Sequence, residues 1–224
     1  MNALRLDAAI IDLDGTMVDT LGDFVVALNA MLDDLALPAV ERHFVEQTVG
    51  KGSEHLVRRT LAHAGAAPER FDAAFARYQH HYLAINGRHS ELYPGVVEGL
   101  RQLQAAGLKL ACLTNKPGAF ARPLLAAKGI EQFFTFVFGG DAFSAKKPDP
   151  LPLLKTCEAL GTAPGRTLMV GDSSNDAEAA HAAGCPLVLV SYGYNHGQPV
   201  RALRAEAHVD RLDALDLAAL RRHP

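Results

Sequence analysis

Two aspartates separated by one residue stand near the start of the chain. Asp12 and Asp14 follow the apolar run 8–11, and Gly15 comes directly after them. An apolar run that ends in polar residues indicates a buried strand entering a loop. The glycine lets that loop turn tightly, so both carboxylates can face one site, where one attacks a substrate and the other transfers protons. The pair by itself is equally compatible with turn residues or helix caps.

A hydroxyl and an amide mark the end of a second apolar run. Thr114 and Asn115 come at the end of the run 108–114, where a predicted strand meets the start of a helix. Both side chains are suited to holding phosphate oxygens beside the free N–H groups of a helix N-terminus. Thr and Asn also cap helices readily, so the pair alone leaves both interpretations open.

A pair of cations and two further carboxylates follow later in the chain. Lys146 and Lys147 precede a proline, whose restricted backbone would hold one ammonium in place, although a solvated surface pair is the alternative. Asp172 and Asp176 follow the apolar run 167–170. Asp176 is also a residue type that favours the first turn of a helix.

The apolar runs that precede these polar groups predict a parallel sheet. The runs that we interpret as strands are 8–11, 108–114, 167–170 and 187–190, with 133–138 as a short additional strand. Three glycines are natural ends for the helices between them: Gly107, Gly161 and Gly184. This alternation indicates βαβ crossovers and an α/β fold, in which ligands bind beyond the carboxyl ends of the strands.

Residues 19–90 follow a different pattern, in which apolar residues recur at helical spacing and strands are not indicated. The three stripes are Leu21, Phe24, Val25, Leu28 and Leu32; Leu56, Val57 and Leu61; and Phe71, Phe75, Tyr78 and Tyr82. We interpret the aromatic stripe as the core of a small helical bundle. The turn residues Tyr93-Pro94-Gly95 mark the return of the chain. The predicted division is a core from 1–17 and 91–224, with an inserted helical domain at 18–90.

The composition excludes several classes of protein. With 224 residues, 49% hydrophobic and 21% charged, the chain can bury a core without disulfides or structural metals. A net charge of −3 with scattered Lys and Arg argues against a nucleic-acid partner. Cys112, Cys157 and Cys185 lack CxxC spacing and predict buried thiols in a reducing cytosol. Without a leader or an apolar run of about 20 residues, we expect a soluble cytoplasmic protein with no membrane partner.

In the order DLDGT, LTN, KKPDP and GDSSND, the four polar groups resemble the four motifs of the haloacid dehalogenase-like hydrolase superfamily. This resemblance implies a Rossmann-like parallel sheet core with an inserted small α-helical cap. It implies that Asp12 is the nucleophile and becomes transiently phosphorylated. Asp14 would then be the general acid and base. Lys147, rather than Lys146, would neutralise charge on the nucleophile and the phosphate.

The same resemblance implies which residues bind ligands. Thr114 and Asn115 would hold the transferred phosphoryl group. The implied Mg²⁺ ligands are Asp12, the backbone carbonyl of Asp14 and Asp172, and Asp176 would support them without contacting the ion. Oxygen ligands favour Mg²⁺ over Zn²⁺. Mg²⁺ and a lysine together would also offset the repulsion between these carboxylates and a phosphate dianion.

The superfamily contains other activities, and two residues bear on the choice between them. Halide-transferring members generally lack the second aspartate, so Asp14 favours phosphoryl transfer. Phosphonate-cleaving members need a cap lysine, and Lys51, the only lysine of residues 18–90, has no sign of desolvation. A phosphomutase and a non-catalytic phosphate-binding module stay as alternatives. Product analysis and an assay with and without Mg²⁺ separate them.

Four further stretches resemble the bacterial phosphoglycolate phosphatases: VGKG at 49–52, YPGV at 93–96, FGGD at 138–141 and SYGYN at 191–195. The resemblance implies hydrolysis of a small phosphate ester, 2-phosphoglycolate, to glycolate and phosphate through an aspartyl-phosphate. Gly50, Lys51 and Gly52 would then lie against the leaving group. Phosphatases of N-acetylmuramic acid 6-phosphate, other sugar phosphates or pyrophosphate have similar cores and stay open. The sequence does not indicate an oligomeric state.

Overall fold

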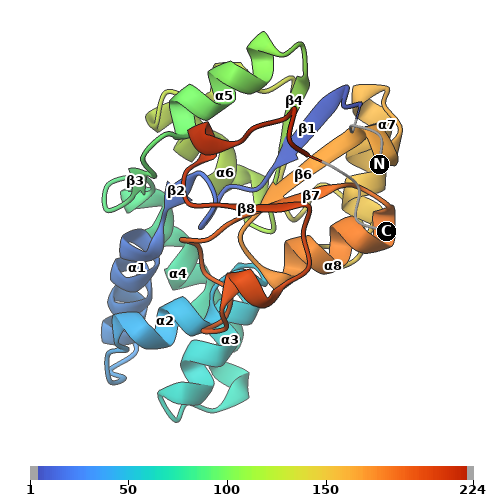
Figure 1. Ribbon diagram of the computed structural model, residues 1–224. Coiled ribbons are helices and arrows are strands. Elements are labelled where there is room, and N and C mark those ends of the chain that lie inside the picture. The colour runs from blue at the N-terminus through green and yellow to red at the C-terminus, as the bar shows by residue number, and fades with distance from the viewer. Residues whose placement is uncertain (1–4, 221–224) are drawn as a thin grey trace.

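The computed structural model describes residues 5–220 and contains a six-stranded parallel sheet (Figure 1). The strands lie in the order β5-β4-β1-β6-β7-β8. Their bounds are Ala8–Ile11 (β1), Lys109–Leu113 (β4), Phe136–Phe138 (β5), Thr167–Gly171 (β6), Leu187–Val190 (β7) and Ala207–Val209 (β8). In the register of the central strands, Ile11 lies opposite Cys112 of β4 and Val170 of β6. The polar residues that follow these strands therefore lie at one edge of the sheet.

Helices cover both faces of this sheet. Their bounds are Val96–Ala105 (α5), Gly118–Ala127 (α6), Leu151–Leu160 (α7) and Ser174–Ala183 (α8). Ala9 and Ile11 of β1 belong to an apolar cluster with α5 and α6, whereas Ala8 and Ile10 belong to a cluster with α7 and α8. Successive strand residues point to opposite faces, so a continuous apolar run buries both sides of its strand. The predicted α/β fold is confirmed.

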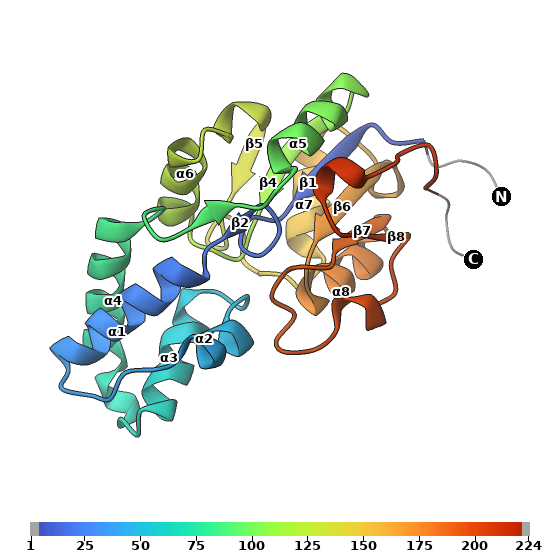
Figure 2. The ribbon, with the colours of Figure 1, turned by 60° about the vertical axis from the view of Figure 1, so that its left-hand side comes forward.

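Residues 20–90 contain four α-helices that gather at one end of the molecule (Figures 1 and 2). They are Leu21–Asp34 (α1), Arg42–Thr48 (α2), Ser53–His63 (α3) and Phe71–Ile85 (α4). They share an apolar cluster of their own, in which Tyr78 and Tyr82 are fully buried. The aromatic stripe is thus core material, as the helical spacing predicted, and the helical insertion into the α/β core is confirmed.

A two-stranded antiparallel ladder joins the helical segment to the sheet. It pairs β2 (Val18–Asp19) with β3 (Glu91–Leu92), so the chain leaves and returns at neighbouring points. Neither strand was predicted, because two residues carry no periodicity. Strand β8 was also missed. It has three residues, all half-buried, so it lacks the continuous apolar run that identified the other strands.

Two further expectations concern the whole chain. Within residues 5–220, no helix combines the length and apolar character that crossing a bilayer requires. Cys112, Cys157 and Cys185 are all buried with free thiols, as expected of small apolar side chains in a packed core.

Candidate active site

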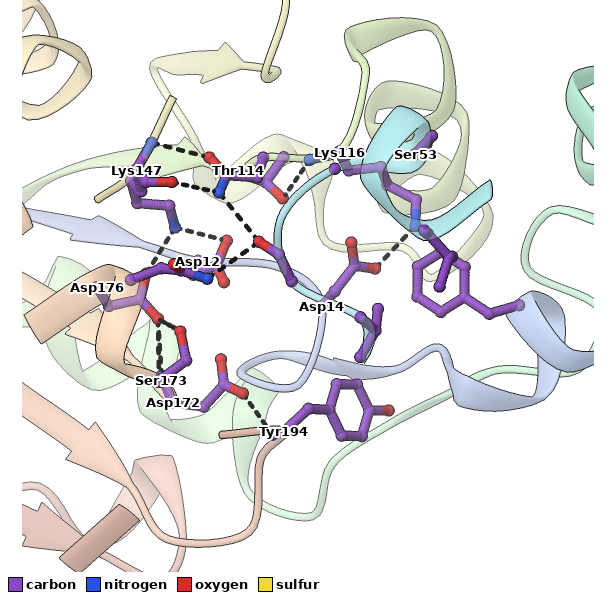
Figure 3. A pocket seen from close by; sticks show the side chains of 17 residues that line it. Asp12, Asp14, Ser53, Thr114, Lys116, Lys147, Asp172, Ser173, Asp176 and Tyr194 are labelled. Atoms are coloured by element: carbon purple, nitrogen blue, oxygen red, sulfur yellow. Dashed lines mark hydrogen bonds and ion pairs between the residues drawn. The ribbon is translucent and has the colours of Figure 1, made fainter. Parts of the chain in front are cut away.

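The four polar groups converge at the carboxyl ends of β1, β4 and β6 (Figure 3). They line one pocket, whose core residues are Asp12, Asp14, Thr114, Asn115, Lys116, Lys147, Asp172, Ser173, Asn175, Asp176 and Tyr194. The helical segment closes it with Phe24, Val49, Gly50, Gly52, Ser53 and Leu56. The walls therefore combine charged groups from the sheet edge with mainly apolar groups from the helices. Such a pocket is typical of a small-molecule site.

Asp12 is a buried carboxylate in the wall of this pocket. It follows β1 directly and is 8% exposed. Its Oδ1 lies 2.9 Å from Nζ of Lys147. Burial raises the pKa of Asp12 from its ordinary value of 3.8 to about 7, although the ammonium of Lys147 acts in the opposite direction. A bound cation would oppose this effect of burial on the pKa and favour the ionised, nucleophilic form of Asp12.

The ammonium of Lys147 forms ion pairs with two aspartates. Its Nζ lies 2.9 Å from Asp12 and 2.6 Å from Asp176, and it donates a 3.0 Å hydrogen bond to the carbonyl of Leu113. Burial by itself would lower the pKa of Lys147, but the two carboxylates raise it above its usual range. Lys146 is half-buried and is not among the residues that line the pocket.

Three carboxylates stand close enough together to share a cation. Oxygens of Asp12, Asp172 and Asp176 lie within 4.8 Å of one another, and all three residues are buried. Burial, followed by the charges of Asp176 and Asp12, raises the pKa of Asp172 well above its usual range. Three adjacent buried carboxylates repel one another when ionised, so this donor set fits a hard divalent cation.

Asp172 and Asp176 have different hydrogen-bond partners. Asp172 accepts hydrogen bonds from the hydroxyl of Thr16 at 2.8 Å and from the backbone N–H of Tyr194 at 2.6 Å. Asp176 accepts from the Ser173 hydroxyl at 2.8 Å in a capping box at the start of α8. Asp176 therefore caps the start of α8, which was one of its two interpretations from the sequence. It also contacts Lys147.

Asp14 and Thr114 lie toward the side of the pocket that holds Lys116. Asp14 is partly exposed, and its Oδ1 accepts a 2.8 Å hydrogen bond from Nζ of Lys116. The Thr114 hydroxyl accepts a 3.2 Å hydrogen bond from the backbone N–H of Lys116. That hydroxyl can still donate, because a threonine oxygen is both donor and acceptor. Thr114 can thus offer its proton to a phosphate oxygen.

Asn115 uses both ends of its side chain on neighbouring backbone. Its Nδ2 donates to the carbonyls of Lys147 at 2.8 Å and Gly50 at 3.0 Å, and its Oδ1 accepts from the N–H of Lys147 at 3.0 Å. The Gly50 carbonyl also accepts a 3.2 Å hydrogen bond from Asn175. Asn115 therefore positions the lysine loop and ties the helical segment to the sheet edge. Its contact with a phosphoryl group stays a prediction.

The loop before α3 reaches the pocket through its glycines. Gly50 and Gly52 have φ of 113° and 88°, in the left-handed region that favours glycine, and both line the pocket. Lys51 between them is exposed and is not a lining residue. Ser53, the first residue of α3, is buried against the site. The predicted contact of this loop with a leaving group rests on the glycines and Ser53.

Lys116 is a site residue that sequence reasoning missed. It is 4% exposed and lines the pocket beside Asp14. Its position directly after Thr114 and Asn115 was the available signal, but a lysine at that position is equally typical of a surface loop. Phe24 was interpreted only as bundle core, although it also lines the pocket.

The sheet order, the inserted helices and the four strand-end groups define a class of hydrolase. The chain belongs to the haloacid dehalogenase-like hydrolase family, whose model matches residues 9–190. It is 43% identical over 212 residues to the phosphoglycolate phosphatase of Thiobacillus denitrificans, covering 93% of each chain. It is 46% identical over 215 residues to the plasmid phosphoglycolate phosphatase of Cupriavidus necator, covering 95% of this chain and 93% of the relative. The predicted family is confirmed.

Solved structures agree with this assignment. A predicted phosphoglycolate phosphatase from Haemophilus somnus 129PT superposes with a TM-score of 0.89 at 34% identity, covering 93% of this chain and 95% of that chain. CbbY from Rhodobacter sphaeroides, solved in complex with phosphate, has a TM-score of 0.82 at 23% identity, over 96% of this chain and 99% of that chain. The second likeness concerns the fold alone.

Proposed function

We propose that the protein is a Mg²⁺-dependent phosphatase that hydrolyses 2-phosphoglycolate to glycolate and inorganic phosphate. The observation that carries the proposal is the geometry around Asp12, where a buried carboxylate pairs with a charged lysine beside two further buried aspartates. Relatives named phosphoglycolate phosphatase, at 43% and 46% identity over nearly the whole chain, support the choice of substrate. We also propose that the enzyme acts in the cytoplasm.

In the proposed reaction, Asp12 attacks phosphorus and the bond from phosphorus to the ester oxygen breaks. Asp14 gives its proton to that oxygen, so glycolate leaves as the alcohol. Asp14 then takes a proton from water, which attacks the aspartyl-phosphate and releases phosphate with the Asp12 carboxylate restored. Lys147 and the Thr114 hydroxyl stabilise charge on the phosphoryl oxygens.

The metal would be held by residues that already stand together. Its proposed ligands are the carboxylates of Asp12 and Asp172 and the backbone carbonyl of Asp14, with Asp176 in support. When bound, Mg²⁺ supplies charge neutralisation and a fixed orientation for the phosphate. Asp176 already holds Lys147 and the start of α8, so it positions the lysine and orders the backbone next to Asp172.

We propose further that residues 1–17 and 91–224 form the catalytic core and that residues 18–90 form its cap. The core groups contact the phosphoryl group that all candidate substrates share, so selectivity has to come from groups that face the leaving group. Gly50, Gly52 and Ser53 line the pocket from the proposed cap, which supports assigning this selectivity to them. We also include Lys51 as a weaker contributor to this selectivity, because its side chain is exposed.

The test is a comparison of kcat/KM across phosphate esters, with Mg²⁺ and with a chelator. We expect 2-phosphoglycolate to exceed N-acetylmuramic acid 6-phosphate, pyrophosphate and simple sugar phosphates. If any of these is hydrolysed about tenfold more efficiently, roughly 1.4 kcal/mol in transition-state binding, the substrate assignment is wrong. Release of inorganic phosphate excludes a mutase, and full activity with the chelator would contradict metal dependence.

A further inference from the structure

A second buried lysine lies in the pocket, apart from the lysine that pairs with Asp12. In Figure 3, Lys116 and Lys147 stand on opposite sides of Asp12 and Asp14. Lys147 belongs to the end where phosphorus is attacked. Lys116 lies toward the cap, near Ser53 at the start of α3. The pocket therefore has two cationic ends, one on each side of its central carboxylates.

The ammonium of Lys116 is enclosed by cap aromatic rings. Its Nζ lies 4.4 Å from the ring centre of Phe24 and 4.8 Å from that of Tyr82. These rings come from α1 and α4, whereas the lysine comes from the loop after β4. Ring faces attract a cation, and they also exclude water, so an anion that reaches this ammonium interacts with it strongly.

Lys116 retains hydrogen-bonding capacity toward the pocket. An ammonium has three N–H donors, and one is used on Oδ1 of Asp14 at 2.8 Å. Within residues 5–220, no second oxygen accepts from this group. A buried ammonium that is only partly satisfied is costly unless a ligand completes its contacts. An anionic oxygen of the substrate is the group that would do so.

The position of Asp14 relates this cation to the leaving group. The general acid has to reach the ester oxygen within hydrogen-bond distance. Lys116 lies 2.8 Å from the same carboxylate. A substituent only one or two bonds from the ester oxygen is therefore brought to Lys116. In 2-phosphoglycolate one methylene carbon separates the ester oxygen from the carboxylate, which matches this short reach.

We propose that Lys116 binds the carboxylate of the leaving group, and that it selects short phosphate esters carrying a carboxylate one carbon from the ester oxygen. This inference rests on the proposed phosphatase function and deepens it. It assigns charge recognition to a lysine of the loop after β4, whereas the sequence indicated only that Gly50, Lys51 and Gly52 lie against the leaving group. The N-terminus of α3 at Ser53 adds free N–H groups on the same side of the pocket.

The experiment measures selectivity for charge. Wild type and Lys116→Met are compared on 2-phosphoglycolate and on 2-hydroxyethyl phosphate, an analogue with an uncharged leaving group in which a hydroxymethyl group replaces the carboxylate. We expect wild type to prefer the acid at least about tenfold. Lys116→Met should lower that ratio of kcat/KM values about tenfold or more, as expected for a lost charge-assisted hydrogen bond. Methionine keeps an unbranched apolar chain against Phe24.

Two matched lysine variants accompany this measurement. Lys155→Met changes an exposed lysine on α7 that does not line the pocket, and it should leave the ratio unchanged. Lys51→Met tests the competing cation of the cap loop. If Lys51→Met, rather than Lys116→Met, removes the preference for the acid, the proposal is overturned. An unchanged ratio in Lys116→Met overturns it as well.

The remaining outcomes separate the roles of Lys116. If Lys116→Met lowers kcat/KM equally for both esters, the lysine acts through Asp14 and the proposal fails. If circular dichroism shows that Lys116→Met does not fold, Lys116→Gln takes its place. The ratio of kcat/KM values for Lys116→Gln is then compared with that of wild type. A wild type that hydrolyses both esters equally overturns the inference but leaves the phosphatase function intact. A wild type that hydrolyses neither contradicts the proposed function itself.

Discussion

At the scale of single residues, Asp12 lies where burial and charge act in opposite directions on one carboxylate. Burial favours the protonated form, and Lys147 favours the ionised form. The lysine is itself fixed by Asp176 and by the carbonyl of Leu113, so it does not depend on Asp12 for its position. Removing the charge of Asp12 should therefore leave the surrounding network in place.

Asp12→Asn is expected to abolish turnover without unfolding the protein. The amide is nearly isosteric with the carboxylate, but it cannot act as the nucleophile. The rate should fall by several orders of magnitude. Measurement of kcat on 2-phosphoglycolate, with circular dichroism as the check on folding, tests this. Residual activity above about one-tenth of wild type would exclude Asp12 as the nucleophile.

The raised pKa values of Asp12 and Asp172 predict a pH-dependent response to metal. Between pH 3.8 and about 7 the folded protein holds a proton on Asp12 that the unfolded chain has released. Stability from Asp12 is thus full at low pH and is lost as pH rises through about 7. Mg²⁺ binds the ionised carboxylates, so its stabilising effect should grow with pH.

Thermal unfolding from pH 5 to pH 8, with Mg²⁺ and with a chelator, checks this expectation. The increase in Tm caused by Mg²⁺ should become larger toward pH 8. Asp172→Asn removes one of the repelling carboxylates and should make the response to Mg²⁺ smaller. A Tm increase that is constant or that shrinks with pH would contradict the account.

At the scale of elements, the strands with the clearest signal in the sequence are those buried on both faces. β1, β6 and β7 have every residue buried, so β1 and β7 are unbroken apolar runs and β6 is apolar after Thr167. Gly161 and Gly184 end α7 and α8 with φ of 67° and 76°, as helix-ending glycines do. β5 is also short and partly buried, but it lies within the predicted run 133–138. β2, β3 and β8 have no such pattern, and only the assembled sheet identifies them.

The site was predictable where a residue type alone carries the chemistry. The aspartates and Lys147 belong to strand-end motifs that are continuous in the sequence. The roles of Asn115 and Lys116 depend on partners that are distant along the chain. Asn115 contacts Gly50 and Lys147, and Lys116 contacts Asp14. Such pairings exist only after folding, so spacing within one motif could not indicate them.

Asn115→Ala should weaken the connection between the cap loop and the lysine loop. It removes hydrogen bonds to Lys147 and Gly50. We expect the free energy of unfolding to fall by about 1–3 kcal/mol, because buried backbone groups lose their partners. We also expect lower kcat/KM, since Lys147 is less well positioned.

Asn175→Ala is the matched control for this element. Asn175 contacts the Gly50 carbonyl but not the lysine loop. Its loss should affect both quantities less than Asn115→Ala does. Chemical denaturation and steady-state kinetics provide the two measurements. An Asn115→Ala variant as stable and as active as wild type would show that these hydrogen bonds are not important.

At the scale of the whole molecule, the pocket exists only where the helical segment meets the sheet edge. Ligand binding should therefore slow amide hydrogen exchange in both parts. With Asp12→Asn, Mg²⁺ and 2-phosphoglycolate, we expect protection of residues 50–53 and of residues 114–116. Exchange in α7, which packs against the sheet and contributes no residue to the pocket, should not change. Protection confined to residues 114–116 would mean that the cap loop does not close over the substrate.

The ladder between β2 and β3 has a consequence for how this protein can diversify. Val18 pairs with Leu92 and Asp19 with Glu91, so the ends of the inserted segment lie side by side. Adjacent antiparallel strands are only about 5 Å apart. An insertion that begins and ends at one point can be lengthened, shortened or exchanged without moving the register of the parallel sheet. Mutation can therefore reshape the substrate-facing half while the phosphate chemistry is inherited unchanged.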